Sequence, residues 1–94
     1  FEHFEASAKE GDEFGQYHLG SCFYSRYGVE QSYENAFYWF LKSAEQGLCN
    51  AQETVGSIYY SGDGCGKSNE NSIIWYKKAA KQGKISSINI LKSR

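Results

Sequence analysis

The segment of this 94-residue chain that most resembles a ligand-binding motif is residues 61–68, Ser-Gly-Asp-Gly-Cys-Gly-Lys-Ser. Gly66, Lys67 and Ser68 end it as a nucleotide-binding P-loop ends, with glycines whose backbone N–H groups suit a phosphate. The first position of such a loop should be Gly, and here it is Ser61. A P-loop also follows a β-strand, whereas residues 51–60 have the pattern of a helix. We therefore interpret 61–68 as a turn and expect no nucleotide cofactor.

Histidine and cysteine, the common metal ligands and nucleophiles, form no recognisable site. His3 and His18 have no ligand residues at metal-binding spacing, and Cys22, Cys49 and Cys65 match neither CxxC nor a usual zinc pattern. Three cysteines cannot all pair within one chain, and we expect them to be buried or half-buried free thiols. No Ser or Cys carries the sequence signature of an activated nucleophile. A catalytic triad assembled from distant positions has no such signature in the sequence. The sequence predicts no catalytic residue, no metal and no cofactor.

Charge and hydropathy argue against two classes of partner. The chain has 10 Lys and Arg against 11 Asp and Glu, a net charge of −1, and neither half is markedly basic. It lacks the positive field that nucleic acid or an anionic membrane requires, so we expect neither. The longest apolar run, residues 36–41, is far shorter than the roughly 20 residues of a membrane-spanning helix. We predict no membrane insertion, and the sequence indicates no compartment.

A 36-residue repeat organises the whole chain. Gly11, Gly47 and Gly83 are 36 residues apart, and no gap is needed to extend the match. Within a unit the matched positions recur at about 100° per residue over 15–23 and again over 36–44, which predicts a pair of helices. The same shift superimposes Ala8 on Ala44 and Ala80, Gln16 on Gln52, Gly20 on Gly56, Tyr24 on Tyr60, Gly28 on Gly64, and Trp39 on Trp75.

Local signals place the ends of these helices. Ser32 and Ser68 occupy N-cap positions, with acidic residues in the turns that follow. Gly47 and Gly83 are suited to end the second helices, because glycine adopts positive φ at no steric cost. Small residues at Gly20, Gly56 and the repeated alanines would let neighbouring helices approach closely. The expected helices span 1–10, 13–26, 32–46, 49–61, 68–82 and 85–94.

These helices give one helical-repeat domain over residues 1–94. We expect 1–11 to be the second helix of a partial repeat, 12–47 and 48–83 to be complete repeats, and 84–94 to be the first helix of a partial or capping repeat. Lys92 stands where the units have Gly20 and Gly56, which favours a cap. The sequence as a whole has the organisation of a fragment of a longer array.

The repeated motif resembles the Sel-one-like repeat family, a branch of the tetratricopeptide-like helical repeats. Its pattern is Ala-Gln-x-x-(Leu/Val)-Gly-x-x-(Phe/Tyr), a glycine, and then a capped helix with Trp-x-x-Lys-(Ser/Ala)-Ala-x-Gln-Gly. The first unit supplies Gln16, Leu19, Gly20, Phe23, Gly28, Ala36, Trp39, Lys42, Ser43, Ala44, Gln46 and Gly47. The second supplies Ala51, Gln52, Val55, Gly56, Tyr59, Gly62, Gly64, Trp75, Lys78, Ala79, Ala80, Gln82 and Gly83.

The resemblance implies an all-α, right-handed α/α solenoid of stacked antiparallel helix pairs. It also implies a non-catalytic scaffold or adaptor that binds a protein or peptide. Cysteine-rich relatives have been linked to β-lactam binding or hydrolysis, which leaves an enzyme as one alternative; a purely structural spacer is another. Those relatives clamp helix pairs with disulfides between cysteines eight apart, and Cys22, Cys49 and Cys65 do not fall at that spacing.

The resemblance further implies that the first helix of each unit lines the concave side of the solenoid. Tyrosines among small polar residues suit a protein-binding groove, because tyrosine gives large contact area at low entropic cost, although an ordinary solvated face has the same pattern. The predicted groove residues are Tyr17, His18, Ser21, Tyr24, Glu53, Ser57, Tyr60 and Asn89. The alternative is an outer face with Tyr38, Leu41 and Ile74, where a partner or a second copy would dock. Self-association through the repeat ends is also open.

Overall fold

The computed structural model of the protein describes residues 2–25 and 32–92, with backbone alone for 2–4, and these residues form six helices. The side chain of His3 and the whole of Gly28 therefore lie outside this description. No strand occurs within the described ranges, and the all-α prediction is confirmed. The helices are α1 (Glu2–Lys9), α2 (Glu13–Ser25), α3 (Tyr33–Glu45), α4 (Cys49–Ser61), α5 (Asn69–Lys81) and α6 (Ile85–Lys92).

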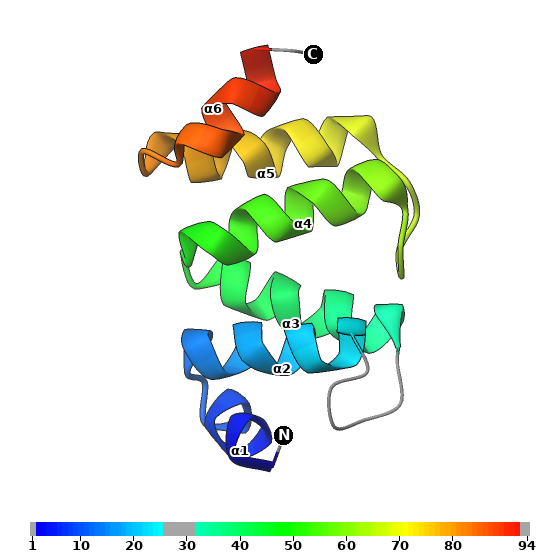
Figure 1. Ribbon diagram of the computed structural model, residues 1–94, viewed down its shortest axis with the longest axis vertical. Coiled ribbons are helices and arrows are strands. Elements are labelled where there is room, and N and C mark those ends of the chain that lie inside the picture. Colours follow the sequence, from blue (N-terminus) through cyan, green and yellow to red (C-terminus); the bar gives the residue numbers. More distant parts are fainter. Residues whose placement is uncertain (1, 26–31, 93–94) are drawn as a thin grey trace.

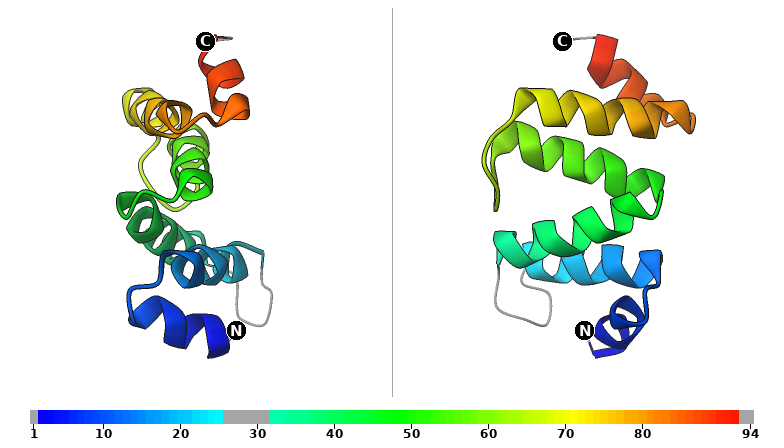
Figure 2. Two further views of the ribbon diagram at one scale, coloured as in Figure 1. Left: turned by 90° about the vertical axis from the view of Figure 1, so that its left-hand side faces the viewer. Right: turned by 180° about the vertical axis from the view of Figure 1, so that it is seen from behind.

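The helices stack in two layers along the longest axis of the molecule (Figure 1). Each helix packs against the next one in the chain, from α1 against α2 to α5 against α6. In the left view of Figure 2, α2, α4 and α6 lie in one layer, and α3 and α5 lie in the other. This is the antiparallel helix-pair solenoid expected from the repeat, and the first helix of every unit lies on the same side. We call the side formed by α2, α4 and α6 the first-helix face.

The predicted capping signals are confirmed at both complete second helices. The hydroxyl oxygen of Ser32 accepts a hydrogen bond of 3.2 Å from the backbone N–H of Asn35 at the start of α3. Ser68 does the same for Asn71 at the start of α5. Such a bond satisfies one of the N–H groups that the first turn leaves unpaired. After α3, Gly47 has a φ of +98°, in the left-handed region where only glycine is unstrained.

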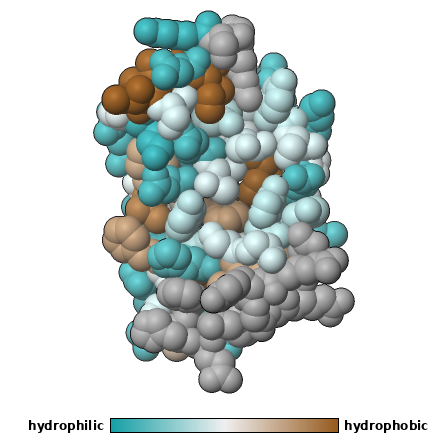
Figure 3. Space-filling model, in the orientation of Figure 1, coloured by the Kyte–Doolittle hydropathy of each residue, from teal (hydrophilic) through white to brown (hydrophobic). Residues whose placement is uncertain are grey.

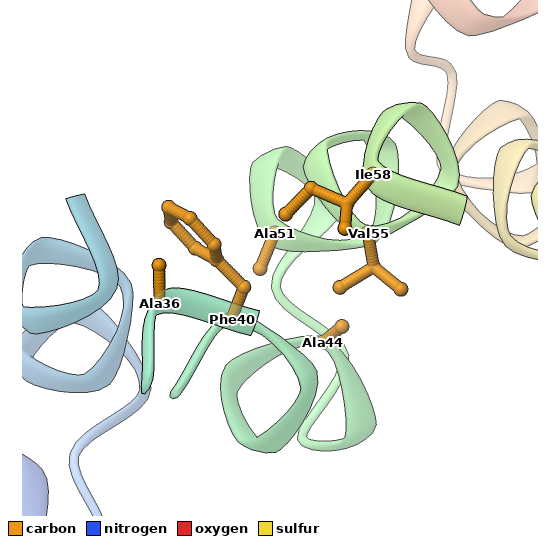
Figure 4. Packing of buried hydrophobic residues seen from close by; sticks show 6 residues of the cluster. All are labelled: Ala36, Phe40, Ala44, Ala51, Val55 and Ile58. Carbon is orange, nitrogen blue, oxygen red and sulfur yellow. The ribbon is translucent and has the colours of Figure 1, made fainter. Parts of the chain in front are cut away.

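Buried hydrophobic side chains join the two units in the centre of the molecule. Three of them, Ala36, Phe40 and Ala44, come from α3, and they face Ala51, Val55 and Ile58 of α4 (Figure 4). All are at most 3% exposed. Alanines let the backbones come close, and the larger side chains fill the space between them. Tyr17, Phe23, Phe37, Leu41, Leu48, Tyr59, Cys65 and Trp75 pack around this cluster.

One glycine in each complete unit, Gly20 or Gly56, lies where the two helices of that unit pack closely. A Cβ atom on Gly20 would lie 2.9 Å from the Phe40 ring and 3.1 Å from the carbonyl oxygen of Ala36. A Cβ atom on Gly56 would lie 3.1 Å from both the Ser72 carbonyl oxygen and the Tyr76 ring. Such distances are tighter than ordinary van der Waals contact. The small-residue positions seen in the sequence therefore do set the spacing of α2 on α3 and of α4 on α5.

The repeated glutamines form a hydrogen-bonded ladder that the sequence reading did not foresee. Gln16 is 5% exposed, and its amide donates to the carbonyl oxygen of Ala8 at 3.3 Å. The amide of Gln46 donates to Gln16 Oε1 and to the carbonyl oxygen of Gly11, both at 2.8 Å. One glutamine pair thus links α1, α2 and α3. The same bonds recur one unit later among Gln52, Ala44, Gln82 and Gly47.

Candidate functional site

An open hollow of about 330 Å³ lies on the first-helix face. Figure 3 looks onto this face and shows small hydrophobic areas among paler and hydrophilic side chains. Every element from α2 to α6 contributes to its lining, which comprises Tyr24 from α2, Phe40 from α3, Glu53, Thr54, Ser57 and Ile58 from α4, Tyr76 from α5 and Ile90 from α6. Two units and the start of a third are therefore needed to form it.

The floor of the hollow is the hydrophobic core itself. Phe40, Ile58 and Tyr76 are each 3% exposed, so only an edge of each side chain reaches the hollow. Tyr24 forms a wall: its ring centroid lies 4.9 Å from that of Tyr33 and 6.4 Å from that of Phe40. These contacts hold the Tyr24 ring in place, although the side chain is still 38% exposed. The Tyr24 wall of the hollow is therefore supported by two neighbouring rings.

Glu53 provides the only carboxylate among the described residues that line the hollow. Its Oε2 accepts a hydrogen bond of 2.6 Å from the hydroxyl of Ser86 and one of 2.9 Å from the hydroxyl of Ser87. Both donors belong to α6, so Glu53 fixes α6 against α4. Both donors are also neutral. Among the described side chains, the ion pair within 4 Å joins Lys9 to Glu5 in α1, and no Lys or His lies that close to the Glu53 carboxylate.

A second carboxylate, Asp63, lies beside Tyr24 and belongs to the turn after α4. The Tyr24 hydroxyl donates a hydrogen bond of 3.3 Å to Asp63 Oδ2, which ties the second unit back to the first. Burial, together with the charge and the hydrogen bond of Asp63, raises the pKa of Tyr24 above its ordinary value of 10.0. In the same turn, Gly64 has a φ of +83° and packs closely on the Tyr33 backbone. The segment 61–68 follows a helix and is the turn that the sequence predicts.

Of the predicted groove residues, the structure brings three together at the hollow: Tyr24, Glu53 and Ser57. The others lie outside its lining. Tyr17 is half-buried against Phe40 with its ring centroids 5.5 Å apart, and Ser21 donates to the Tyr17 carbonyl oxygen. His18 and Asn89 are exposed, and Tyr60 is 51% exposed with Lys67 Nζ 5.8 Å from its ring centroid.

The predicted groove did not include four lining residues: Phe40, Ile58, Tyr76 and Ile90. Thr54, the counterpart of His18, is expected only at the margin of the same face. Phe40 and Tyr76 are core residues, but part of each is also reachable from the first-helix face. Thr54 and Ile90 are the counterparts of His18 in the next two units. The 36-residue repeat therefore places them on the same face as His18.

The alternative outer face is only partly exposed. Tyr38 and Ile74 are 51% and 48% exposed, as the helical wheel predicts. Leu41, in contrast, is half-buried and packs against the core cluster. Lys42 places its Nζ 5.1 Å from the centroid of the Tyr38 ring and partly covers it. The outer face therefore presents single apolar side chains beside lysines.

The cysteines and acidic side chains give no metal site in the described part of the chain, where no three His, Cys, Asp or Glu residues come together. Cys22 is buried, and Cys49 and Cys65 are half-buried; all three are free thiols. Burial, and then the charge of Asp63, raises the pKa of Cys65 above its ordinary value. None of the described helices combines the length and the hydrophobicity needed to cross a membrane.

The stacked helix pairs and their repeated glutamine bonds define the chain as a helical-repeat protein. The family model of the Sel1 repeat matches residues 14–48 and 50–84, most of the chain. The protein belongs to the Sel1 repeat family, whose members are generally non-catalytic modules of protein interaction. Comparison with curated proteins gives no significant match.

Solved structures share the fold. A Sel1 repeat protein from Oxalobacter formigenes superposes with a TM-score of 0.92 at 30% identity, over 96% of this chain and 26% of that one. A protective antigen of uropathogenic Escherichia coli strains gives 0.87 at 34% identity, over 89% and 18%. Cysteine-rich protein B of Helicobacter pylori gives 0.91, over 95% and 67%, and at 17% identity it shows the fold alone. The chain spans about a quarter and about a fifth of the lengths of these first two relatives.

Proposed function

We propose that this protein is a scaffold or adaptor module that binds an extended protein segment along the first-helix face, as part of a longer repeat array. The observation that carries the proposal is the hollow between Tyr24 and Ile90, which has an apolar floor and a hydroxyl- and carboxylate-bearing rim. This combination is typical of sites where a few polar groups orient a mainly apolar contact.

The size of the hollow favours one anchoring side chain over a complete small molecule. Its volume of about 330 Å³ is at the lower end of the roughly 300–1,000 Å³ of small-molecule pockets. Because Tyr60 is the counterpart of Tyr24, a further unit would place a similar hollow one repeat along the array. Paired tyrosines of this kind would contact successive anchors of one extended partner, with the small entropy loss that suits tyrosine to binding surfaces.

The enzymatic alternative gains no support from the residues that line the hollow. Thr54 and Ser57 carry its aliphatic hydroxyl groups, and the Thr54 hydroxyl donates to the carbonyl oxygen of Asn50. Among the described residues, no hydrogen bond links either hydroxyl to a side chain that would serve as a general base. Binding explains this lining better than nucleophilic catalysis does.

The experiment blocks each face with the same bulky residue. Peptides are selected from a random displayed library with the unaltered chain, and their affinity is measured for Ser57→Trp, at the exposed rim of the hollow, and for Ile74→Trp, on the outer face. We expect Ser57→Trp to lower affinity by about thirtyfold or more, the loss typical of a blocked anchor site. Ile74→Trp should leave affinity unchanged. Circular dichroism checks that both variants fold, and the opposite pattern would place the site on the outer face.

A further inference from the structure

Carboxylates are the charged groups that the described residues bring to the hollow. Glu53 lies in its lining, and Asp63 is bonded to Tyr24, which forms one wall. Their hydrogen-bond donors are neutral hydroxyls, and none of the Lys or His side chains in residues 5–25 and 32–92 lies within 4 Å of either carboxylate. The hollow therefore offers negative charge that the described part of the chain leaves unpaired.

The remaining lining suits a long cationic side chain. Phe40, Ile58, Tyr76 and Ile90 provide apolar surface for an aliphatic stem. Lysine and arginine bury such stems while keeping their charged ends at polar groups. A purely apolar anchor would instead remove water from the Glu53 carboxylate with no compensating charge, which is costly.

We propose that the hollow selects a basic side chain, arginine or lysine, from the bound protein segment, with its charged end at Glu53 and its stem against Phe40 and Ile58. The inference rests on the proposed function, because it specifies which residue of a bound segment occupies the hollow. A contact between a basic side chain and Glu53 also makes binding sensitive to salt, because part of the attraction is between charges at a partly exposed site.

The test uses the whole chain and peptides selected from a random displayed library. The enriched peptides should share an arginine or lysine, and replacing that residue with norleucine should weaken binding to the unaltered chain about tenfold. On Glu53→Gln the same replacement should change affinity by less than about threefold, because the charge that it met is gone. Glu45→Gln is the matched control, since it removes an exposed carboxylate outside the hollow and should behave like the unaltered chain. If Glu53→Gln unfolds, the loss caused by norleucine is compared on the unaltered chain at about 50 mM and about 500 mM salt, where screening should reduce it; an equal loss at both would overturn the inference.

The outcomes separate this inference from the proposed function. Selected peptides with no shared basic residue, or a basic residue whose loss costs as much on Glu53→Gln as on the unaltered chain, would overturn the inference. If those peptides were still blocked by Ser57→Trp, the groove itself would stand. Peptides that bind Ser57→Trp as well as the unaltered chain, or a selection that enriches no peptide, would count against both.

Discussion

The side-chain amide of Gln82 donates a hydrogen bond of 2.9 Å to the side-chain oxygen of Gln52, and Gln46 donates to Gln16 in the same way at 2.8 Å. Each acceptor also donates onward to a carbonyl oxygen near the end of the preceding second helix. Helix ends leave carbonyl groups without internal partners. The carbonyl oxygens of Ala8 and Ala44 also accept from the backbone N–H groups of Gly11 and Gly47, so the glutamines add a second donor to them and join three helices. This part of the repeated motif therefore serves stability.

Gln52→Glu should therefore be destabilising in a pH-dependent way. Position 52 is 6% exposed, and a carboxylate there would face the carbonyl oxygen of Ala44 with no proton to donate. We expect a loss of about 1–3 kcal/mol in unfolding free energy at neutral pH. Burial raises the pKa of the new carboxyl in the folded state, so part of the loss should be recovered near pH 4, where the protonated group donates again. Urea denaturation at both pH values, each referenced to the unaltered chain, checks this; an equal loss at both would contradict it.

The glycine contacts predict which alanine substitutions the fold rejects. In Gly20→Ala and Gly56→Ala, the added methyl carbon would lie 2.9–3.1 Å from a ring and a carbonyl oxygen, closer than ordinary van der Waals contact, which costs about 1–3 kcal/mol. Better helix propensity returns at most about 1 kcal/mol, so both variants should melt at lower temperature. Gly66→Ala is the control, because nothing lies within 4 Å of its added carbon. A raised melting temperature for Gly20→Ala would show that α2 and α3 are not in close contact there.

Stability should fall under alkaline conditions, in part through Tyr59. Burial, then the charges of Cys65 and Glu45, raises the pKa of Tyr59 above 10.0. The folded state then keeps a proton that the unfolded state loses, so the stabilisation is complete below about pH 10 and is lost as pH rises through the raised pKa. Tyr59→Phe should flatten this decline, and the equivalent residue of the first unit is Phe23. Urea midpoints from about pH 8 to 11 measure the slope. The same slope in both proteins would rule out a contribution from Tyr59.

The helices were predictable from the sequence because their signals are local. The N-caps at Ser32 and Ser68 and the glycines that follow the second helices act on neighbouring backbone groups, and the observed helix ends match them closely. The glutamine ladder was not predictable in the same way. Repetition shows that Gln16 and Gln52 recur, but their partners Gln46 and Gln82 come from another helix, and only the packed structure shows the contact.

The hollow was predictable only in part for a similar reason. A helical wheel assigns Tyr24 and Ser57 to the first-helix face, since this depends on one helix at a time. It does not show that the edges of Phe40 and Tyr76 remain reachable between neighbouring helices, because that depends on helix spacing. Leu41 illustrates the opposite error: the wheel places it on the outer face, and packing half-buries it.

The most direct test of binding on the first-helix face is an NMR titration of the isotopically labelled chain with a selected peptide. Backbone amide shifts report contact residue by residue and require no substitution. We predict that the largest changes occur at Tyr24, Thr54, Ser57 and Ile58, which line the hollow, while Tyr38 and Ile74 change little. Changes concentrated at Tyr38 and Ile74, with the hollow unaffected, would contradict the proposed function and place the binding site on the outer face.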